Sequence, residues 1–205
     1  MASLPPARPE LAALGREELT RPPPEVHKIA VLRANALGDF IFCLPALEAL
    51  RATYPAAEIT LLARAMHQQL LDGRPGPVDR VVVLPRIRGV SVPDHQETDE
   101  KEAAACVEAL KADRFDVAVQ IHGGGAYSNP FLRSLGARTT VGLKAPDAEA
   151  PDRWIPYFYY QHEVLRYLEV VSLLGVRPAA LEPRLQVTER DLGEAAGVLD
   201  ALPGP

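Results

Sequence analysis

The 205-residue chain is long enough for one α/β core, or for one domain with short appendages. Hydrophobic residues make up 47% and charged residues 24% of the chain, which is ordinary for a globular protein. A formal net charge of −5 argues against a nucleic-acid-binding protein, which usually has a basic face, but it leaves room for a local phosphate pocket.

The first 26 residues are rich in proline, and we expect them to form a flexible extension with at most a short helix over residues 10–19. They lack the basic start and apolar run of a signal peptide. The chain also lacks the run of about 18 apolar residues that could span a bilayer. We therefore expect a cytoplasmic protein with, at most, peripheral contact with the inner membrane.

From residue 28 onward, apolar strands alternate with amphipathic helices. We expect strands at residues 28–33, 58–63, 80–84, 115–121, 139–143 and 185–187, and helices at residues 40–54, 66–71, 99–113, 131–135, 161–174 and 188–202. Pro45 should kink the first helix or mark the start of its regular part. Gly175 is placed to end the helix before it, and Thr188 with Asp191 resembles a capping box. The alternation predicts an α/β domain over residues 27–202, with a Rossmann-like parallel sheet and helices on both faces.

Two long segments, residues 85–98 and 144–160, show no regular period. Loops of this length inside a compact domain are usually functional or disordered. In an open parallel sheet, ligands bind beyond the carboxyl ends of the strands. This rule places residues 33–39, 85–98 and 122–129 at one common site.

The turn after the first strand, Asn35-Ala36-Leu37-Gly38-Asp39, places Asp39 at the start of a helix. Free backbone N–H groups there favour a carboxylate, so the local pattern alone favours helix capping over catalysis for Asp39. No GxGxxG motif accompanies the turn, so dinucleotide binding is not indicated. Cys43 and Cys106 form no CxxC or Cys/His cluster, which predicts buried thiols and no metal site.

Residues 28–55 resemble the opening of the family 9 glycosyltransferases, the family of the ADP-heptose:lipopolysaccharide heptosyltransferases. The shared pattern is an apolar strand, a small-residue turn ending in Gly38-Asp39, and a helix that carries Pro45-Ala46-Leu47. Residues 57–62 and 115–123 resemble the strands that follow in the family. The family is similar to GT-B glycosyltransferases, in which two Rossmann-like domains face a cleft. The resemblance thus implies an N-terminal, acceptor-binding half of GT-B type, with the C-terminal donor-binding domain absent from this chain.

The resemblance also implies a reaction. A heptose-like sugar is transferred with inversion, and without metal or cofactor, from a nucleotide sugar of the ADP-heptose type to a lipopolysaccharide-core or related glycan acceptor. Asp39 then acts as the general base, because a carboxylate within hydrogen-bond reach can accept the proton of an acceptor hydroxyl. With the resemblance added, catalysis is favoured over capping for Asp39. The 205-residue chain alone is expected to be inactive.

Candidate substrate-binding residues lie in the same three segments: Arg33, Asn35, Gly38, Arg86, Arg88, His122, Gly123 and Gly124. Many family members have an acidic-x-Gln-Gly pattern where this chain has His122 and the following glycines. His122 is suited to bind acceptor hydroxyls; the alternative is a loop histidine beside a flexible turn. Guanidinium groups suit phosphate, although such residues are more often solvated surface charges. The aromatic residues at positions 154 and 157–160 suggest stacking on a sugar, but packing of this irregular stretch onto the core is favoured.

Two other functions compete with the transferase hypothesis. One is a non-catalytic binding or interaction module that keeps the Rossmann-like scaffold. The other is a small nucleotide-binding enzyme, against which the missing glycine fingerprint counts. A shared fold alone does not decide between them.

Overall fold

The computed structural model describes residues 22–177 and 180–200. The helix expected over residues 10–19, and most of the proline-rich extension, lie outside the described residues.

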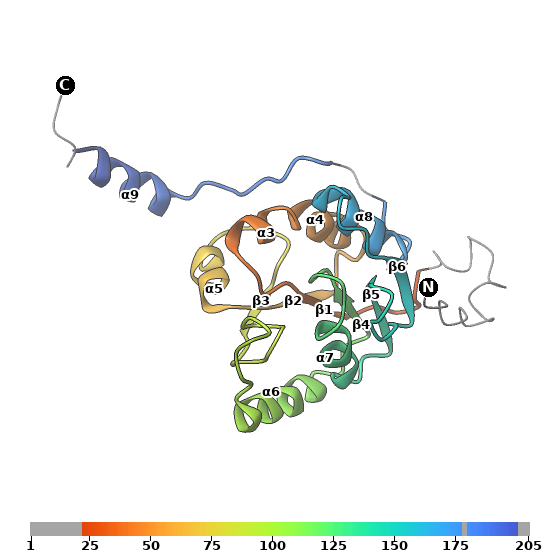
Figure 1. Cartoon of the computed structure of the whole chain (residues 1–205). Coiled ribbons are helices and arrows are strands. Elements are labelled where there is room, and N and C mark those ends of the chain that lie inside the picture. Colours follow the sequence, from red (N-terminus) through yellow and green to blue (C-terminus); the bar gives the residue numbers. More distant parts are fainter. Residues whose placement is uncertain (1–21, 178–179, 201–205) are drawn as a thin grey trace.

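A six-stranded sheet forms the centre of the molecule (Figure 1). Its strands are β1 (Lys28–Leu32), β2 (Glu58–Ala63), β3 (Arg80–Val83), β4 (Val117–Gln120), β5 (Thr139–Lys144) and β6 (Arg153–Pro156). They lie in the order β3-β2-β1-β4-β5-β6, and every neighbouring pair is parallel. The predicted Rossmann-like parallel sheet is confirmed. The order reverses between β1 and β4, where the connections that leave these two strands diverge and open a crevice.

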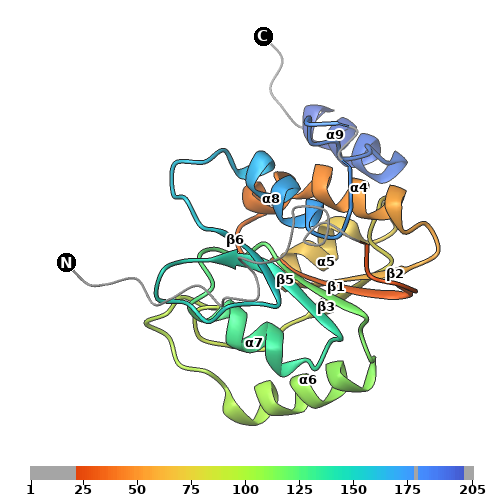
Figure 2. The ribbon, with the colours of Figure 1, turned by 90° about the vertical axis from the view of Figure 1, so that its right-hand side faces the viewer.

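Helices cover both faces of the sheet (Figures 1 and 2). One face carries α3 (Leu37–Ile41), α4 (Leu44–Thr53), α5 (Ala65–Leu71) and α8 (Glu163–Ser172), and the other carries α6 (Glu100–Ala112) and α7 (Ser128–Ser134). The last helix, α9 (Glu189–Asp200), lies outside this sandwich and has no buried residue. Helices on both faces are as the alternating pattern predicted.

Strand β1 shows why the sheet is apolar throughout. Ile29 and Val31 belong to the hydrophobic core beneath α4 and α8, whereas Ala30 and Leu32 belong to the core above α6 and α7. All four side chains are fully buried. A strand that is covered on both faces needs apolar residues at every position, which explains the continuous hydrophobic run in the sequence.

The expected helix over residues 40–54 is two helices. The chain breaks at Phe42 and Cys43, and α4 starts again with Pro45 in its first turn. Proline is tolerated there because the first helical N–H groups have no intrahelical partner. Pro45 therefore marks the start of the regular helix, as predicted. Cys43, at the break, is buried, and burial raises the pKa of its thiol to about 12.

The second half of the chain differs from expectation in two strands. The irregular segment 144–160 contains β6, a short edge strand that pairs with β5 alone and was not predicted. The strand expected at residues 185–187 is absent, because that part of the chain has left the sheet.

Two predicted helix ends are confirmed. The backbone N–H of Thr188 donates to the Asp191 carboxylate (2.7 Å), and the N–H of Asp191 donates to the Thr188 hydroxyl (3.3 Å). These reciprocal bonds form the capping box at the start of α9. Gly175, with a φ of 77°, ends the turn that follows α8. The positive φ explains why a glycine stands there.

We predict that Gly142→Ala destabilises the fold. A Cβ at this buried position in β5 would lie 2.9 Å from the Cβ of Gln120 and 3.1 Å from its carbonyl oxygen. We expect the free energy of unfolding to fall by about 1–3 kcal/mol, the usual effect of overpacking. Gly38→Ala is the control, because nothing lies within 4 Å of its added Cβ. Urea unfolding followed by the fluorescence of Trp154 measures both; equal stabilities would contradict the prediction.

Candidate functional site

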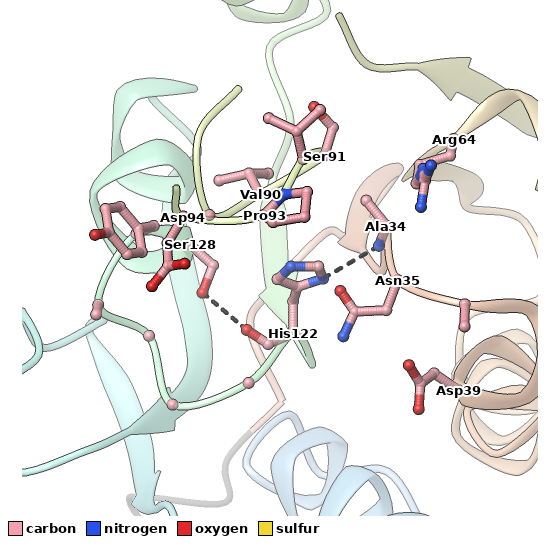
Figure 3. A pocket seen from close by; sticks show the side chains of 18 of the residues that line it. Ala34, Asn35, Asp39, Arg64, Val90, Ser91, Pro93, Asp94, His122 and Ser128 are labelled. Carbon is pink, nitrogen blue, oxygen red and sulfur yellow. Dashed lines mark hydrogen bonds between the residues drawn. The ribbon is translucent and has the colours of Figure 1, made fainter. Parts of the chain in front are cut away.

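A pocket of about 570 Å³ opens beyond the carboxyl ends of β1 and β4, at the point where the strand order reverses (Figure 3). Three connections supply most of its walls: residues 34–39 after β1, residues 89–94 after β3, and residues 122–128 after β4. The structure thus brings together the three segments that the sequence places at one site. Arg64 after β2 and Ala145 after β5 complete the lining.

Asp39 lines this pocket and is not a helix cap. The N-cap of α3 is Ala36, and Asp39 lies in the first turn. Its side chain is 39% exposed, and its one polar partner in the described chain is the guanidinium of Arg33, 3.4 Å away. The capping interpretation is therefore wrong: the carboxylate is not occupied by backbone N–H groups and faces the pocket (Figure 3).

Arg33 lies behind Asp39 and is buried. One guanidinium nitrogen, Nη1, donates to the carbonyl of Ile121 (2.6 Å), and the other, Nη2, lies 3.4 Å from Asp39 and 3.7 Å from Glu163. Burial lowers the pKa of Arg33, and these negative groups oppose that effect. Arg33 does not line the pocket, so the structure places it as a residue that positions Asp39 rather than as one that contacts substrate.

His122 is buried and links two loops through a hydrogen bond. Its Nδ1 accepts the backbone N–H of Ala34 (3.2 Å), which joins the end of β4 to the end of β1. Burial first, and then the positive charge of Arg33, lower the pKa of His122 to about 3; a hydrogen bond with the backbone of Gly89 opposes them. The imidazole is therefore neutral at physiological pH. It lines the pocket as a polar wall with one small exposed edge.

The glycine-containing loop after β4 is held by Gln120. Its amide nitrogen donates to the carbonyls of His122 (2.9 Å) and Gly123 (3.1 Å) and to the hydroxyl of Ser128 (2.6 Å). Gly125 has a φ of 98°, and a Cβ there would lie 2.2 Å from the Asn129 amide. The loop is thus fixed in one conformation. Gly123 and the following Gly124 line the pocket, as does Asn35 on the opposite loop.

Besides Arg33, three of the sequence candidates lie outside the pocket. Arg86 donates to the Gln96 side chain (3.2 Å), and the guanidinium of Arg88 lies 5.7 Å from the ring centroid of Tyr127. Gly38 does not line the pocket either. For Arg86 and Arg88, the surface-charge interpretation fits the structure better than substrate binding at this pocket. Other residues of the same segment, 89–94, face into the pocket instead.

The sequence analysis missed several residues that line the pocket. They are Ser91 and Asp94 from the segment after β3, and Tyr127 and Ser128 from the loop after β4. Gly89, with a φ of 67°, allows these two segments to pack closely, since a Cβ there would lie 2.3 Å from the Tyr127 ring. In the sequence, a glycine in the middle of an irregular segment was the signal that could have indicated these residues. No sequence signal indicated Glu163, because its contact with Arg33 joins parts of the chain that are distant in sequence.

Among residues 22–177 and 180–200, no three His, Cys, Asp or Glu side chains gather where they could hold a metal ion. Over the same residues, no helix is both long and apolar enough to cross a membrane.

The fold has solved counterparts. No protein-family model and no curated protein matches the sequence. The structure resembles that of a family 9 glycosyl transferase from Veillonella parvula, with a TM-score of 0.65 at 17% identity over 85% of this chain and 49% of that one. It also resembles E. coli heptosyltransferase WaaC with ADP-2-deoxy-2-fluoro heptose, with a TM-score of 0.57 at 22% identity over 86% of this chain and 55% of the other. The same enzyme with ADP gives a TM-score of 0.56 at 21% identity, over 86% of this chain and 54% of that one.

The comparisons define the fold and not yet the reaction. The chain has the Rossmann-like fold of the N-terminal half of a GT-B glycosyltransferase, and it spans about half the length of the solved structures that it resembles. Identities of this size show common architecture, while function has to be argued from the site.

The buried imidazole of His122 gives a pH-dependent prediction. Between pH 6.5 and about 3, the unfolded chain binds a proton at this residue that the folded chain does not. Stability must therefore fall as the pH falls through this range, by at most about 1.4 kcal/mol per pH unit from this one group.

Urea unfolding at pH 7.5, 5.5 and 4.5 tests this effect against His122→Gln. The difference in stability between wild type and variant should shrink as the pH falls, because the variant lacks the titrating group. His95→Gln, which removes an exposed imidazole, is the control. A constant difference between wild type and His122→Gln would show that the pKa of His122 is the same in the folded and the unfolded protein.

Proposed function

We propose that this chain is the acceptor-binding half of an inverting, metal-independent glycosyltransferase, and that Asp39 is its general base. The observation that carries the proposal is the Asp39 carboxylate, which lines a preformed pocket at the reversal of the strand order and is free of backbone hydrogen bonds. The fold shared with family 9 enzymes supports the same class of reaction.

The proposed step is a direct displacement. Asp39 accepts the proton of an acceptor hydroxyl as the oxygen of that hydroxyl forms a bond to the anomeric carbon of the donor sugar. The bond from that carbon to the nucleoside diphosphate breaks, and the leaving oxygen takes the electron pair. Attack from the face opposite the leaving group inverts the anomeric centre. Arg33 orients the carboxylate, and the neutral His122 imidazole avoids a second positive charge beside Arg33.

The proposed substrates follow from the comparisons and the lining. The donor is a nucleotide sugar of the ADP-heptose type, in line with the fluorinated ADP-heptose in the WaaC structure. The acceptor is a lipopolysaccharide-core or related glycan, free or as a glycolipid reached by peripheral contact with the inner membrane. The pocket volume is in the range of small-ligand sites, and its backbone, hydroxyl and amide groups suit sugar hydroxyls.

Donor binding is assigned to a second half. The chain corresponds to about half of each solved structure, so we propose that transfer requires a donor-binding domain in addition to residues 22–200. Purified 205-residue protein, given ADP-heptose and a lipid-free core oligosaccharide, should release no ADP above the rate of a protein-free control. Turnover by this chain alone would contradict the assignment.

The role of Asp39 is tested by Asp39→Asn in a polypeptide that carries both halves. We expect kcat to fall by about 10²- to 10⁴-fold, the usual contribution of a general base, with the acceptor KM changed only a few-fold. Asp94→Asn, at another carboxylate that lines the pocket, is the matched control and should keep most of the activity. Thermal unfolding should show that both variants fold. Full activity of Asp39→Asn would exclude the general-base role, whereas an inactive wild-type polypeptide would favour a non-catalytic binding module.

A further inference from the structure

An exposed aromatic loop lies between β6 and α8. Phe158, Tyr159 and Tyr160 are 62%, 77% and 97% exposed, whereas Trp154 and Tyr157 are half-buried. The sequence favoured packing onto the core for this whole stretch. That interpretation is wrong for residues 158–160, which leave large apolar rings in solvent next to the carboxyl edge of the sheet.

The backbone of this loop is nevertheless fixed. The buried Arg166 donates through Nη2 to the carbonyls of Phe158, Tyr159 (3.0 Å) and Gln161 (2.9 Å). The guanidinium also lies 4.6 Å from the centroid of the Tyr157 ring. Hydrogen bonds from a charged donor are stronger than neutral ones, so a single side chain anchors three carbonyls of the loop. The exposed rings are therefore carried on a preorganised backbone, which lowers the entropy cost of binding a ligand.

The loop forms one wall of a second groove, with a volume of about 390 Å³. The groove is lined by Phe42, Tyr157, Tyr159, Gln161, His162 and Glu163. Phe42, Tyr157 and Tyr159 supply apolar ring faces, and Gln161, His162 and Glu163 supply polar groups. Gln161 is already paired with Glu169 and Glu163 with Arg166, and the Glu163 carboxylate disfavours a phosphate.

The second groove adjoins the Asp39 pocket. Nη2 of Arg33 lies close to both carboxylates: 3.4 Å from Asp39, which lines the first pocket, and 3.7 Å from Glu163, which lines the second. Phe42 follows Asp39 by less than one helical turn. A ligand longer than one sugar ring in the Asp39 pocket therefore extends toward the second groove.

We propose that the groove lined by Phe42, Tyr159 and Glu163 is a second carbohydrate subsite, which binds the sugar unit next to the one that reacts at Asp39. This rests on the proposed function. The C–H face of a sugar ring stacks on the electron-rich face of an aromatic ring, here that of Tyr159. The ring hydroxyls then find hydrogen-bond partners in His162 and Glu163. Aromatic faces and polar edges together match the two-faced chemistry of a sugar.

The test uses the 205-residue chain and two probes: a lipid-free inner-core oligosaccharide and its terminal monosaccharide. Calorimetry gives the affinities, and backbone amide NMR shifts locate the binding. We expect the oligosaccharide to bind about 10-fold or more tightly than the monosaccharide. Tyr159→Ala should weaken the oligosaccharide by about 3- to 10-fold, as expected for one aromatic stacking contact, and leave the monosaccharide unchanged.

The controls separate the ring from its surroundings. Phe158→Ala removes an exposed ring of the same loop that does not line the groove, and should change the affinity less than about 2-fold. Tyr159→Phe keeps the stacking face and should retain binding. Because the Tyr159 side chain is exposed, its truncation should leave the thermal unfolding midpoint unchanged.

The remaining outcomes contradict the proposal in distinguishable ways. Equal affinities for the two probes, with shifts confined to the loops of Asn35 and His122, would overturn the second subsite and leave the proposed function intact. No binding of either probe would overturn both. A dimer in sedimentation equilibrium that Tyr159→Ala dissociates would assign the aromatic loop to contact with a second copy of the chain instead.

Discussion

The structure of the site depends on one buried positive charge. Arg33 stands at the end of β1, and its guanidinium donates to the carbonyl of Ile121 at the end of β4, so that it bridges the crevice where the strand order reverses. The same group contacts Asp39 on α3 and Glu163 on α8. A buried cation is costly unless it is paired, and this one has a carbonyl and two carboxylates from different elements as partners, although its Nε has no hydrogen-bond partner among the described residues. The fixed position of Asp39 follows from that requirement.

The electrostatics of the pocket follow from the same charge. His122 is buried close to Arg33, and a protonated imidazole there would add a second cation to a poorly solvated place. The ring is therefore neutral, and its Nδ1 lone pair is free to accept the N–H of Ala34. Burial, reinforced by Arg33, thus keeps the histidine neutral, and the same arginine orients the carboxylate. The two loops that bear these residues are joined by hydrogen bonds before any ligand arrives.

What could be predicted from the sequence was what local patterns determine. The apolar run of β1, the proline at the start of α4 and the capping box of α9 each depend on a few neighbouring residues, and the convergence of three loops follows from the parallel sheet alone. Strand β6 was missed because an edge strand that pairs on one side needs no long apolar run. The local pattern alone favoured a cap at Asp39 because it placed the helix start there, whereas the N-cap of α3 is Ala36. Contacts such as that of Arg33 with Glu163 depend on how distant elements pack, which no local pattern encodes.

The two grooves are linked by an alternating series of charges. Asp39 contacts Arg33, Arg33 contacts Glu163, and Glu163 contacts Arg166, which in turn holds the carbonyls of the aromatic loop. Arginine is needed at both buried positions, because its planar fork donates in several directions while remaining charged, and a lysine ammonium could not reach the same set of partners. Since each carboxylate in the series also faces one of the grooves, the surfaces that would contact adjacent sugars are fixed relative to each other by the same network. A glycan that spans both grooves would therefore bind to two surfaces that are already positioned relative to each other.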